Sequence, residues 1–277
     1  MITIWVVLIV SLTIIIHTLL SAIIVPLSGA LVVDGIGHSV VCGIAIGFLL
    51  SHSLSSPFLL IGAICSALLM QIIRHFLQKN QYISFDAGLG ISFSFLFALG
   101  ILLISLYGRN IHLDLDMILL GNIEYALYDS FFLAGLYIPK IIFYLLGFLV
   151  IFIVLFTALY RSIVMILFDP VFAYTKGAQK NILLIVITVT ASIVVVTSLT
   201  ITGALLLVGI GVAPFGTSWH SSSSYKIFIY KGIITNLLAG LCGTVISLYV
   251  NLPIAATVAL CCTTAGVISL IFKKRKN

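Results

Sequence analysis

The sequence predicts an all-α integral membrane protein, and its composition, its long apolar segments and its basic residues lead to that conclusion. Of 277 residues, 62% are hydrophobic and only 7% are charged, with a mean hydropathy of +1.34. A soluble domain is about 25% charged and about half apolar. Lipid solvates apolar surface that a water-soluble fold of this length would have to hide. The composition therefore excludes a soluble enzyme, a disordered tail and a nucleic-acid-binding protein.

Nine segments are long and apolar enough to cross a bilayer, which takes about 20 residues per helix; the pattern allows eight to ten. The expected spans are about Ile4–Val25, Ser28–Leu50, Pro57–Leu77, Gly88–Tyr107, Ile138–Leu159, Ile182–Ser198, Thr202–Ser218, Phe228–Val250 and Ile254–Phe272. Prolines at 26, 57, 139 and 253 lie near their ends, where helix breakers are expected. The period-2 alternation of barrel strands is missing from the sequence. The chain is predicted to be one polytopic transmembrane domain, residues 1–277.

The basic residues predict an orientation in the cell membrane. With the C-terminus inside, eleven of the thirteen Lys and Arg fall on the cytoplasmic side and only Arg109 and Lys140 fall outside. The cytoplasmic set is Arg74, Lys79, Arg161, Lys176, Lys180, Lys226, Lys231 and the tail Lys273–Lys276. Cytoplasmic loops carry the excess of basic residues in membrane proteins. Nine spans then place the N-terminus outside, and the net charge of +6 reflects these loops.

The segment Ile111–Leu136 is expected to lie on the outer face. It carries four of the seven acidic residues, Asp114, Asp116, Glu124 and Asp129. A negative mouth would raise the local cation concentration, while an ordinary solvated loop is an equal alternative.

Asp34 and His38 are the strongest candidates for a functional site. Ionisable side chains within a membrane are costly and are functional candidates by default. Four residues apart on a helix, these two share one face. A carboxylate oxygen and an imidazole nitrogen make half of a site for a borderline divalent cation, which two symmetric copies would complete. The alternative is a hydrogen-bonded pair that only packs the helix, and the spans place Asp34 rather near the inner face.

Two other features of the first two spans have structural interpretations. The lone His17 is expected to have a packing or hydrogen-bonded role. The glycines of Gly43-x-x-x-Gly47 permit close helix approach.

The stretch 161–180 is the longest polar segment expected on the cytoplasmic side. Asp169 and Pro170 suit the start of a short helix, because Asp caps an N-terminus and Pro fits the first turn, and Gly177 would end it. A short amphipathic helix on this surface can dock into a groove of a partner. A simple connector is the alternative.

Five groups of residues, in order along nearly the whole chain, resemble the ABC-3 family of permeases, the membrane subunits of zinc, manganese and iron ABC importers. They are Val32–Gly47, Asp86–Gly100, Leu113–Asp116 with Leu120–Asn122, Phe168–Pro170 with Ala173 and Gly177, and Thr202–Pro214 with Asn251–Pro253. The sequence departs from the family pattern at Val171, Asn251 and Phe215–Ser218, and it lacks the usual basic residues before Asp34. These departures indicate a divergent member.

The resemblance implies a multi-pass permease of the cell membrane that moves Mn, Zn or Fe ions into the cytoplasm and catalyses no covalent chemistry. It implies that Asp34 and His38 meet the transported ion, with no permanently bound cofactor. It also implies that Phe168, Asp169, Pro170, Ala173 and Gly177 couple the chain to an ATPase. The chain has no Gly-x-x-x-x-Gly-Lys-Ser/Thr loop, so ATP hydrolysis by that route requires separate cytoplasmic subunits.

The other implied partners are an extracytoplasmic metal-binding protein, a second permease copy or paralogue, and the lipid bilayer, with no nucleic acid. The first alternative is an ABC permease for a metal chelate of the siderophore or cobalamin type, which needs no bare Asp/His pair. A membrane-embedded enzyme would need a denser set of polar residues within the spans. A secondary transporter would leave the Phe-Asp-Pro loop unexplained.

Overall fold

Long helices make up most of the computed structural model, which describes residues 2–53, 56–79, 82–107, 123, 127, 129–133 and 136–274. The long helices are α1 (Ile2–Ser28), α2 (Leu31–Ser51), α3 (Pro57–Gln78), α4 (Phe85–Tyr107), α7 (Lys140–Phe168), α9 (Lys180–Ser218), α10 (Tyr225–Val250) and α11 (Ile254–Lys274). The short elements are the strands β1 (Ser130–Leu133) and β2 (Leu136–Pro139), the helix α8 (Pro170–Thr175) and the 3₁₀ turn Trp219–Ser221. The predicted all-helical membrane architecture is confirmed.

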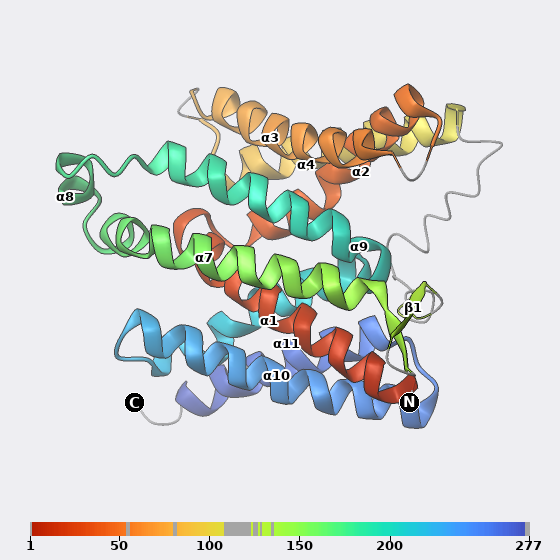
Figure 1. Ribbon diagram of the computed structural model, residues 1–277. Coiled ribbons are helices and arrows are strands. Elements are labelled where there is room, and N and C mark those ends of the chain that lie inside the picture. The colour runs from red at the N-terminus through yellow and green to blue at the C-terminus, as the bar shows by residue number, and fades with distance from the viewer. Residues whose placement is uncertain are drawn as a thin grey trace.

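Seven helices in the described part of the chain are long and apolar enough to span a bilayer, and they belong to α1, α2, α3, α4, α7, α10 and α11. Figure 1 shows them running side by side across the molecule, with α8 and the end of α11 at one end. The N-terminus and the β1 strand lie at the opposite end. The predicted topology requires this separation of the chain ends. Which end faces the cytoplasm stays a prediction from the basic residues.

Helix α9 unites the two spans predicted at Ile182–Ser198 and Thr202–Ser218. A straight helix of its 39 residues would be about 58 Å long, nearly twice the hydrocarbon thickness of a bilayer. The contacts show that it folds back instead. The Ser198 hydroxyl forms a hydrogen bond with His17 of α1. The Asn236 side-chain amide donates both to the hydroxyl of Thr18, the residue after His17 in α1, and to the Ile210 carbonyl.

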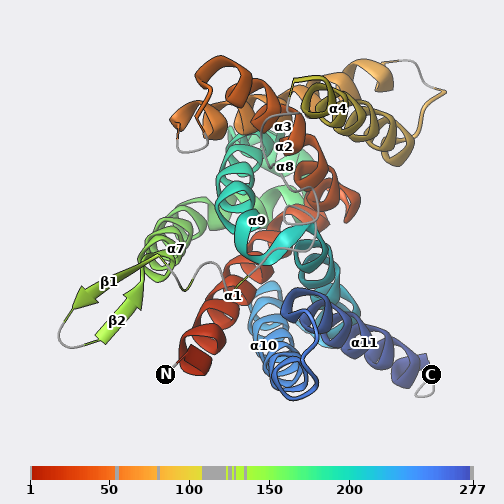
Figure 2. The same ribbon diagram turned by 90° about the vertical axis from the view of Figure 1, so that its right-hand side faces the viewer.

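Ser198 and Ile210 are twelve residues apart in sequence but lie at the same level of α1, one on the first limb of α9 and one on the second. The helix as a whole bridges two groups of helices. The first limb packs beside α3, next to Gln71 and His75. The second limb runs parallel to α11, with Gly209 against Ala259 and Gly216 against Gly266. Figure 2 shows α9 between the group of α2, α3 and α4 and the pair of α10 and α11. With the seven long spans, the two limbs match the nine predicted segments.

A small hairpin before α7 was not predicted. Strands β1 and β2 pair antiparallel, with Ser130 opposite Pro139 and Phe132 opposite Tyr137. The span expected from Ile138 instead begins at Lys140 and continues to Phe168. Aromatic residues favour strands, and a proline suits the residue before a helix because it has no N–H to pair. The Lys140 ammonium pairs with the Asp129 carboxylate, which holds the hairpin to the start of α7.

Glycines allow α2 to touch both neighbouring helices through backbone atoms. A Cβ built on Gly43 would overlap the carbonyl of Gly62 in α3, and one on Gly47 would overlap the carbonyl of Phe58. A Cβ on Gly100 of α4 would lie 2.7 Å from the backbone nitrogen of Cys42. The interpretation of Gly43 and Gly47 as a close-approach pair is confirmed. Helix α2 is thereby fixed between α3 and α4.

We expect Gly43→Ala to destabilise the protein, because the new methyl group meets backbone that cannot move aside. Overpacking of this kind costs about 1–3 kcal/mol. The matched control is Gly37→Ala on the same helix, where a methyl group would meet no atom within 4 Å. Thermal unfolding of the detergent-solubilised variants compares them. Equal midpoints for the two variants would contradict this account of the α2–α3 contact.

Candidate functional site

Asp34 and His38 form a contact on one face of α2. The Nε2 atom of His38 lies 3.2 Å from the Oδ1 atom of Asp34, as expected for residues four apart on a helix. The side chains are 27% and 25% exposed for His38 and Asp34 respectively. In the described part of the chain, the other carboxylate oxygen and the ring nitrogen Nδ1 have no hydrogen-bond partner. The pair is thus half-buried and retains lone pairs for a ligand.

Aromatic side chains of α4 fix the depth of His38. Its ring stacks on Phe93 with centroids 5.8 Å apart and lies at a tilt against Phe97 with centroids 4.9 Å apart. Phe97 lies near the middle of α4 (Phe85–Tyr107). His38 therefore lies level with the middle of α4, and Asp34 lies one helical turn nearer the end where α2 begins, in the first turn of that helix.

Gly37, in the turn of α2 that carries the pair, has open space beside it. It is itself buried, yet a Cβ built on it would meet no atom within 4 Å. Gly35, on another side of the helix, would bring its Cβ to 3.0 Å from the sulfur of Met70. Gly37 lies three residues after Asp34, so the open space beside it adjoins the Asp34 edge of the pair. The His38 edge is packed, because a Cβ on Gly35 would lie 3.3 Å from Phe93, the ring that stacks on His38.

One carboxylate and one imidazole supply two metal donors. No group of three or more His, Cys, Asp or Glu side chains that could enclose a metal ion occurs among the described residues. Structural metal sites usually have four protein ligands, whereas a transport site must hold its ion weakly enough to release it. Asp34 and His38 alone therefore do not form a structural metal site. Of the outer acidic residues, Asp114, Asp116 and Glu124 lie outside the described residues.

The residues predicted to couple the chain to a partner gather at the tip formed by α7 and α8. Phe168 ends α7, and the Asp169 side chain caps α8 by accepting a hydrogen bond of 2.9 Å from the Phe172 backbone N–H. Pro170 is the first residue of α8. Gly177 follows with a φ of +79°, which suits glycine after a helix end. The first part of the predicted loop, residues 161–168, instead continues α7.

The end of α7 and helix α8 present large apolar side chains outward. Phe168, Val171 and Tyr174 are 67%, 75% and 77% exposed, and Figure 1 shows α8 at one end of the molecule. Ala173 differs from them, because it is fully buried in the core cluster. Ala173 therefore seats α8 on the rest of the protein and is not available to a partner. The apolar surface of α8, defined as Phe168, Val171, Phe172 and Tyr174, offers the contacts instead.

A buried polar cluster joins α1 to α9 and α10. His17 is 2% exposed; its Nδ1 is 2.8 Å from the Thr13 carbonyl and its Nε2 is 3.1 Å from the Ser198 hydroxyl. The interpretation of His17 as a hydrogen-bonded packing residue is confirmed. Asn236 donates to the Thr18 hydroxyl at 2.9 Å. Sequence reasoning missed Asn236, because an uncharged amide in an apolar run gives no warning of its partners.

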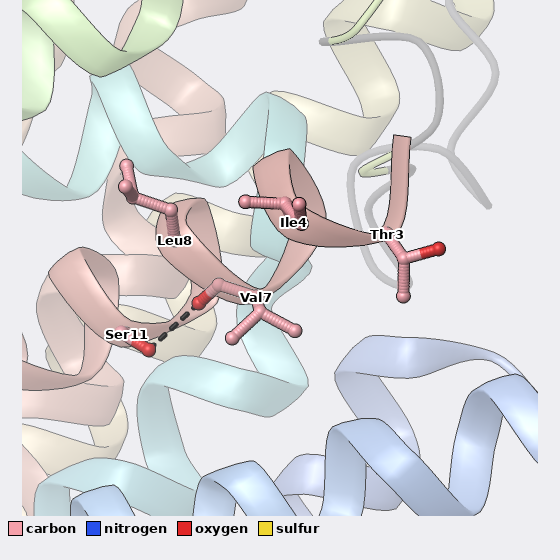
Figure 3. A pocket seen from close by; sticks show the side chains of 5 residues that line it. All are labelled: Thr3, Ile4, Val7, Leu8 and Ser11. Atoms are coloured by element: carbon pink, nitrogen blue, oxygen red, sulfur yellow. Dashed lines mark hydrogen bonds between the residues drawn. The ribbon is translucent and has the colours of Figure 1, made fainter. Parts of the chain in front are cut away.

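A shallow groove along α1 lacks the chemistry for an ion site. Its volume is about 450 Å³, and it is lined by Thr3, Ile4, Val7, Leu8 and Ser11 (Figure 3). The Ser11 hydroxyl already donates to the Val7 carbonyl at 2.7 Å. No lining residue carries a charge. This groove therefore offers no metal site.

The long apolar helices define a polytopic helical membrane protein. The model of the ABC 3 transport family matches residues 1–273. The chain belongs to this family, so it is a membrane-spanning transport subunit.

Known relatives cover most of the chain. A zinc transport system membrane protein of Treponema pallidum, TroD, is 29% identical over 83% of this chain and 62% of its own length; the chain thus spans less than two thirds of that relative. A manganese transport system membrane protein of Bacillus subtilis, MntD, is 29% identical over 80% and 75%. The solved structure of PsaBC from Streptococcus pneumoniae in complex with Fab shares the fold, with a TM-score of 0.79, 24% identity and coverage of 99% and 94%.

The buried position of Ala173 predicts that Ala173→Leu loosens α8. Extra carbon atoms in a packed site cost about 1–3 kcal/mol, and α8 is too short to hold its place without that seat. The matched control is Val171→Leu on the exposed side of α8. Trypsin cleavage at exposed Lys176 in the purified protein should be faster for Ala173→Leu only. Equal cleavage of the two variants would show that Ala173 does not hold the helix.

Proposed function

We propose that this permease imports divalent Mn, Zn or Fe ions and that Asp34 and His38 transiently ligate the ion on its path. The observation that carries the proposal is the position of this half-buried pair, level with the middle of α4 and with open space at Gly37 beside Asp34. The named roles of the zinc and manganese relatives support the choice of cargo.

The cost of burial favours a functional pair over a structural one. Ionisable groups at membrane depth are expensive and usually mark a pathway for ions or protons. Backbone contacts at Gly43 and Gly47 hold α2 against α3, so the position of this helix does not depend on Asp34 and His38 alone. Their mutual contact lowers the free-energy cost of burying the two side chains when no ion is bound. A cation that arrives would be ligated by the carboxylate and the imidazole together.

The donor atoms suit borderline and hard divalent ions. Imidazole nitrogen and carboxylate oxygen bind Mn²⁺, Fe²⁺ and Zn²⁺, while soft Cu⁺ prefers sulfur. Cys42 lies one turn after His38 on α2, but it packs against Gly100 of α4. Water or a second permease copy would complete the coordination shell. A pore for an intact metal chelate, the alternative cargo, would not require such a pair.

Each end of the molecule offers a surface for a different partner. We infer that the apolar surface of α8 docks on a cytoplasmic ATPase, because four large apolar side chains stand exposed at the end where the basic residues gather. An extracytoplasmic metal-binding protein would deliver the ion at the end that carries β1 and β2. A second permease, identical or paralogous, would complete the transporter.

The test of the ion site is metal accumulation by cells that express Asp34→Ala or His38→Ala. We expect uptake of the preferred ion to fall about tenfold or more, because loss even of a group that only supports a metal ligand costs 10–100-fold. The control is His52→Asn at the end of the same helix, where the φ of +50° suits asparagine. Parental uptake by both Ala variants at equal protein levels would refute the assignment.

The test of the coupling surface is Tyr174→Ser combined with Val171→Ser. Removal of exposed apolar side chains should leave the permease folded while uptake and ATPase stimulation both fall, because such side chains supply most docking energy. A cross-link from Tyr174→Cys to the ATPase should form in the parental background. Full uptake by the double variant, without any cross-link, would rule out α8 as the docking element.

A further inference from the structure

A groove between α3 and the first limb of α9 combines a basic end with apolar walls. Its volume is about 350 Å³. It is lined by Leu68, Gln71, Ile72, Arg74 and His75 of α3 and by Leu184, Ile185 and Thr188 of α9. Ile72 and Ile185 are 63% and 54% exposed, so the groove opens on the outside of the helix bundle.

Arg74 is held in place without a carboxylate. Its Nε donates to Gln71 Oε1 at 2.9 Å and its Nη1 donates to Gln78 Oε1 at 3.1 Å. The guanidinium carbon lies 4.5 Å from the ring centre of Phe85. Among the described residues, no acidic side chain lies within ion-pair distance of it. A guanidinium has five N–H donors, so this group is oriented, cationic and able to donate further hydrogen bonds.

The position of Arg74 matches the headgroup level of a bilayer. It lies one turn before the end of α3 (Pro57–Gln78), at the end where the basic residues predict the cytoplasm. His75 follows it and is exposed. Leu68, one and a half turns earlier, and the α9 side chains Leu184 and Ile185 extend the groove with apolar surface. A ligand that fits both parts carries an anion at one end and hydrocarbon at the other.

We propose that this groove binds an anionic phospholipid of the cytoplasmic leaflet. Arg74 and His75 would donate to the phosphate, with Gln71 and Gln78 holding the guanidinium toward it. An acyl chain would lie along Leu68, Ile72, Leu184 and Ile185. Basic pockets between membrane helices on the cytoplasmic side bind anionic headgroups, and guanidinium pairs well with phosphate oxygens. The bound lipid would bridge α3 and the first limb of α9.

The experiment measures lipid binding to the purified permease by native mass spectrometry, without any metal. Phosphatidylglycerol and phosphatidylcholine with the same acyl chains are compared for the parent, Arg74→Gln and Arg161→Gln. The control Arg161 is exposed near the same end of the molecule, on α7. We expect the preference for phosphatidylglycerol to fall about tenfold in Arg74→Gln only, the loss of one charge-assisted pair. The rise in unfolding midpoint that phosphatidylglycerol causes should also be smaller for Arg74→Gln than for the parent.

Three outcomes would overturn the proposal. The first is unchanged phosphatidylglycerol preference in Arg74→Gln with a normal unfolding midpoint. The second is equal stabilisation of the parent by inorganic phosphate alone, which indicates a site for a free anion. The third is a shift of Arg74→Gln from dimer to monomer with no change in lipid binding, which indicates an interface between copies. None of these readouts depends on metal transport.

Discussion

Close backbone contact between helices is the constraint on which the rest of this structure depends. In lipid the hydrophobic effect gives helices no reason to associate with one another, so packing contacts between small residues must supply the attraction. Gly43 against Gly62 joins α2 to α3, and Gly100 against Cys42 joins α2 to α4. Gly209 and Gly216 join the second limb of α9 to α11 in the same way. The positions of the polar side chains follow from these contacts.

The half-buried pair on α2 illustrates this dependence. Because α2 and α4 touch at Cys42 and Gly100, the aromatic rings of Phe93 and Phe97 come against His38. His38 thus lies between those rings and the carboxylate of Asp34. The packing of α2 on α4 therefore determines the surroundings of the pair.

Much of this architecture could be predicted from the sequence, since a bilayer demands long apolar helices and their ends carry recognisable breakers. The Asp34–His38 pair could be predicted because charged residues are rare in such segments. The depth of His38 could not, because it depends on how α2 is displaced along α4. The burial of Ala173 and the hydrogen bonds of Asn236 were also hidden, since both depend on partners distant in sequence. The hairpin at 130–139 was missed because aromatic residues next to a proline also suit the start of a span.

The folded-back course of α9 brings one element into contact with both groups of helices. Only residues 176–179 separate it from α8. Its first limb contacts α1 through Ser198 and His17, and its second limb packs along α11 at Gly209 and Gly216. The surface at α8 and the two halves of the helix bundle are therefore joined by one continuous stretch of chain.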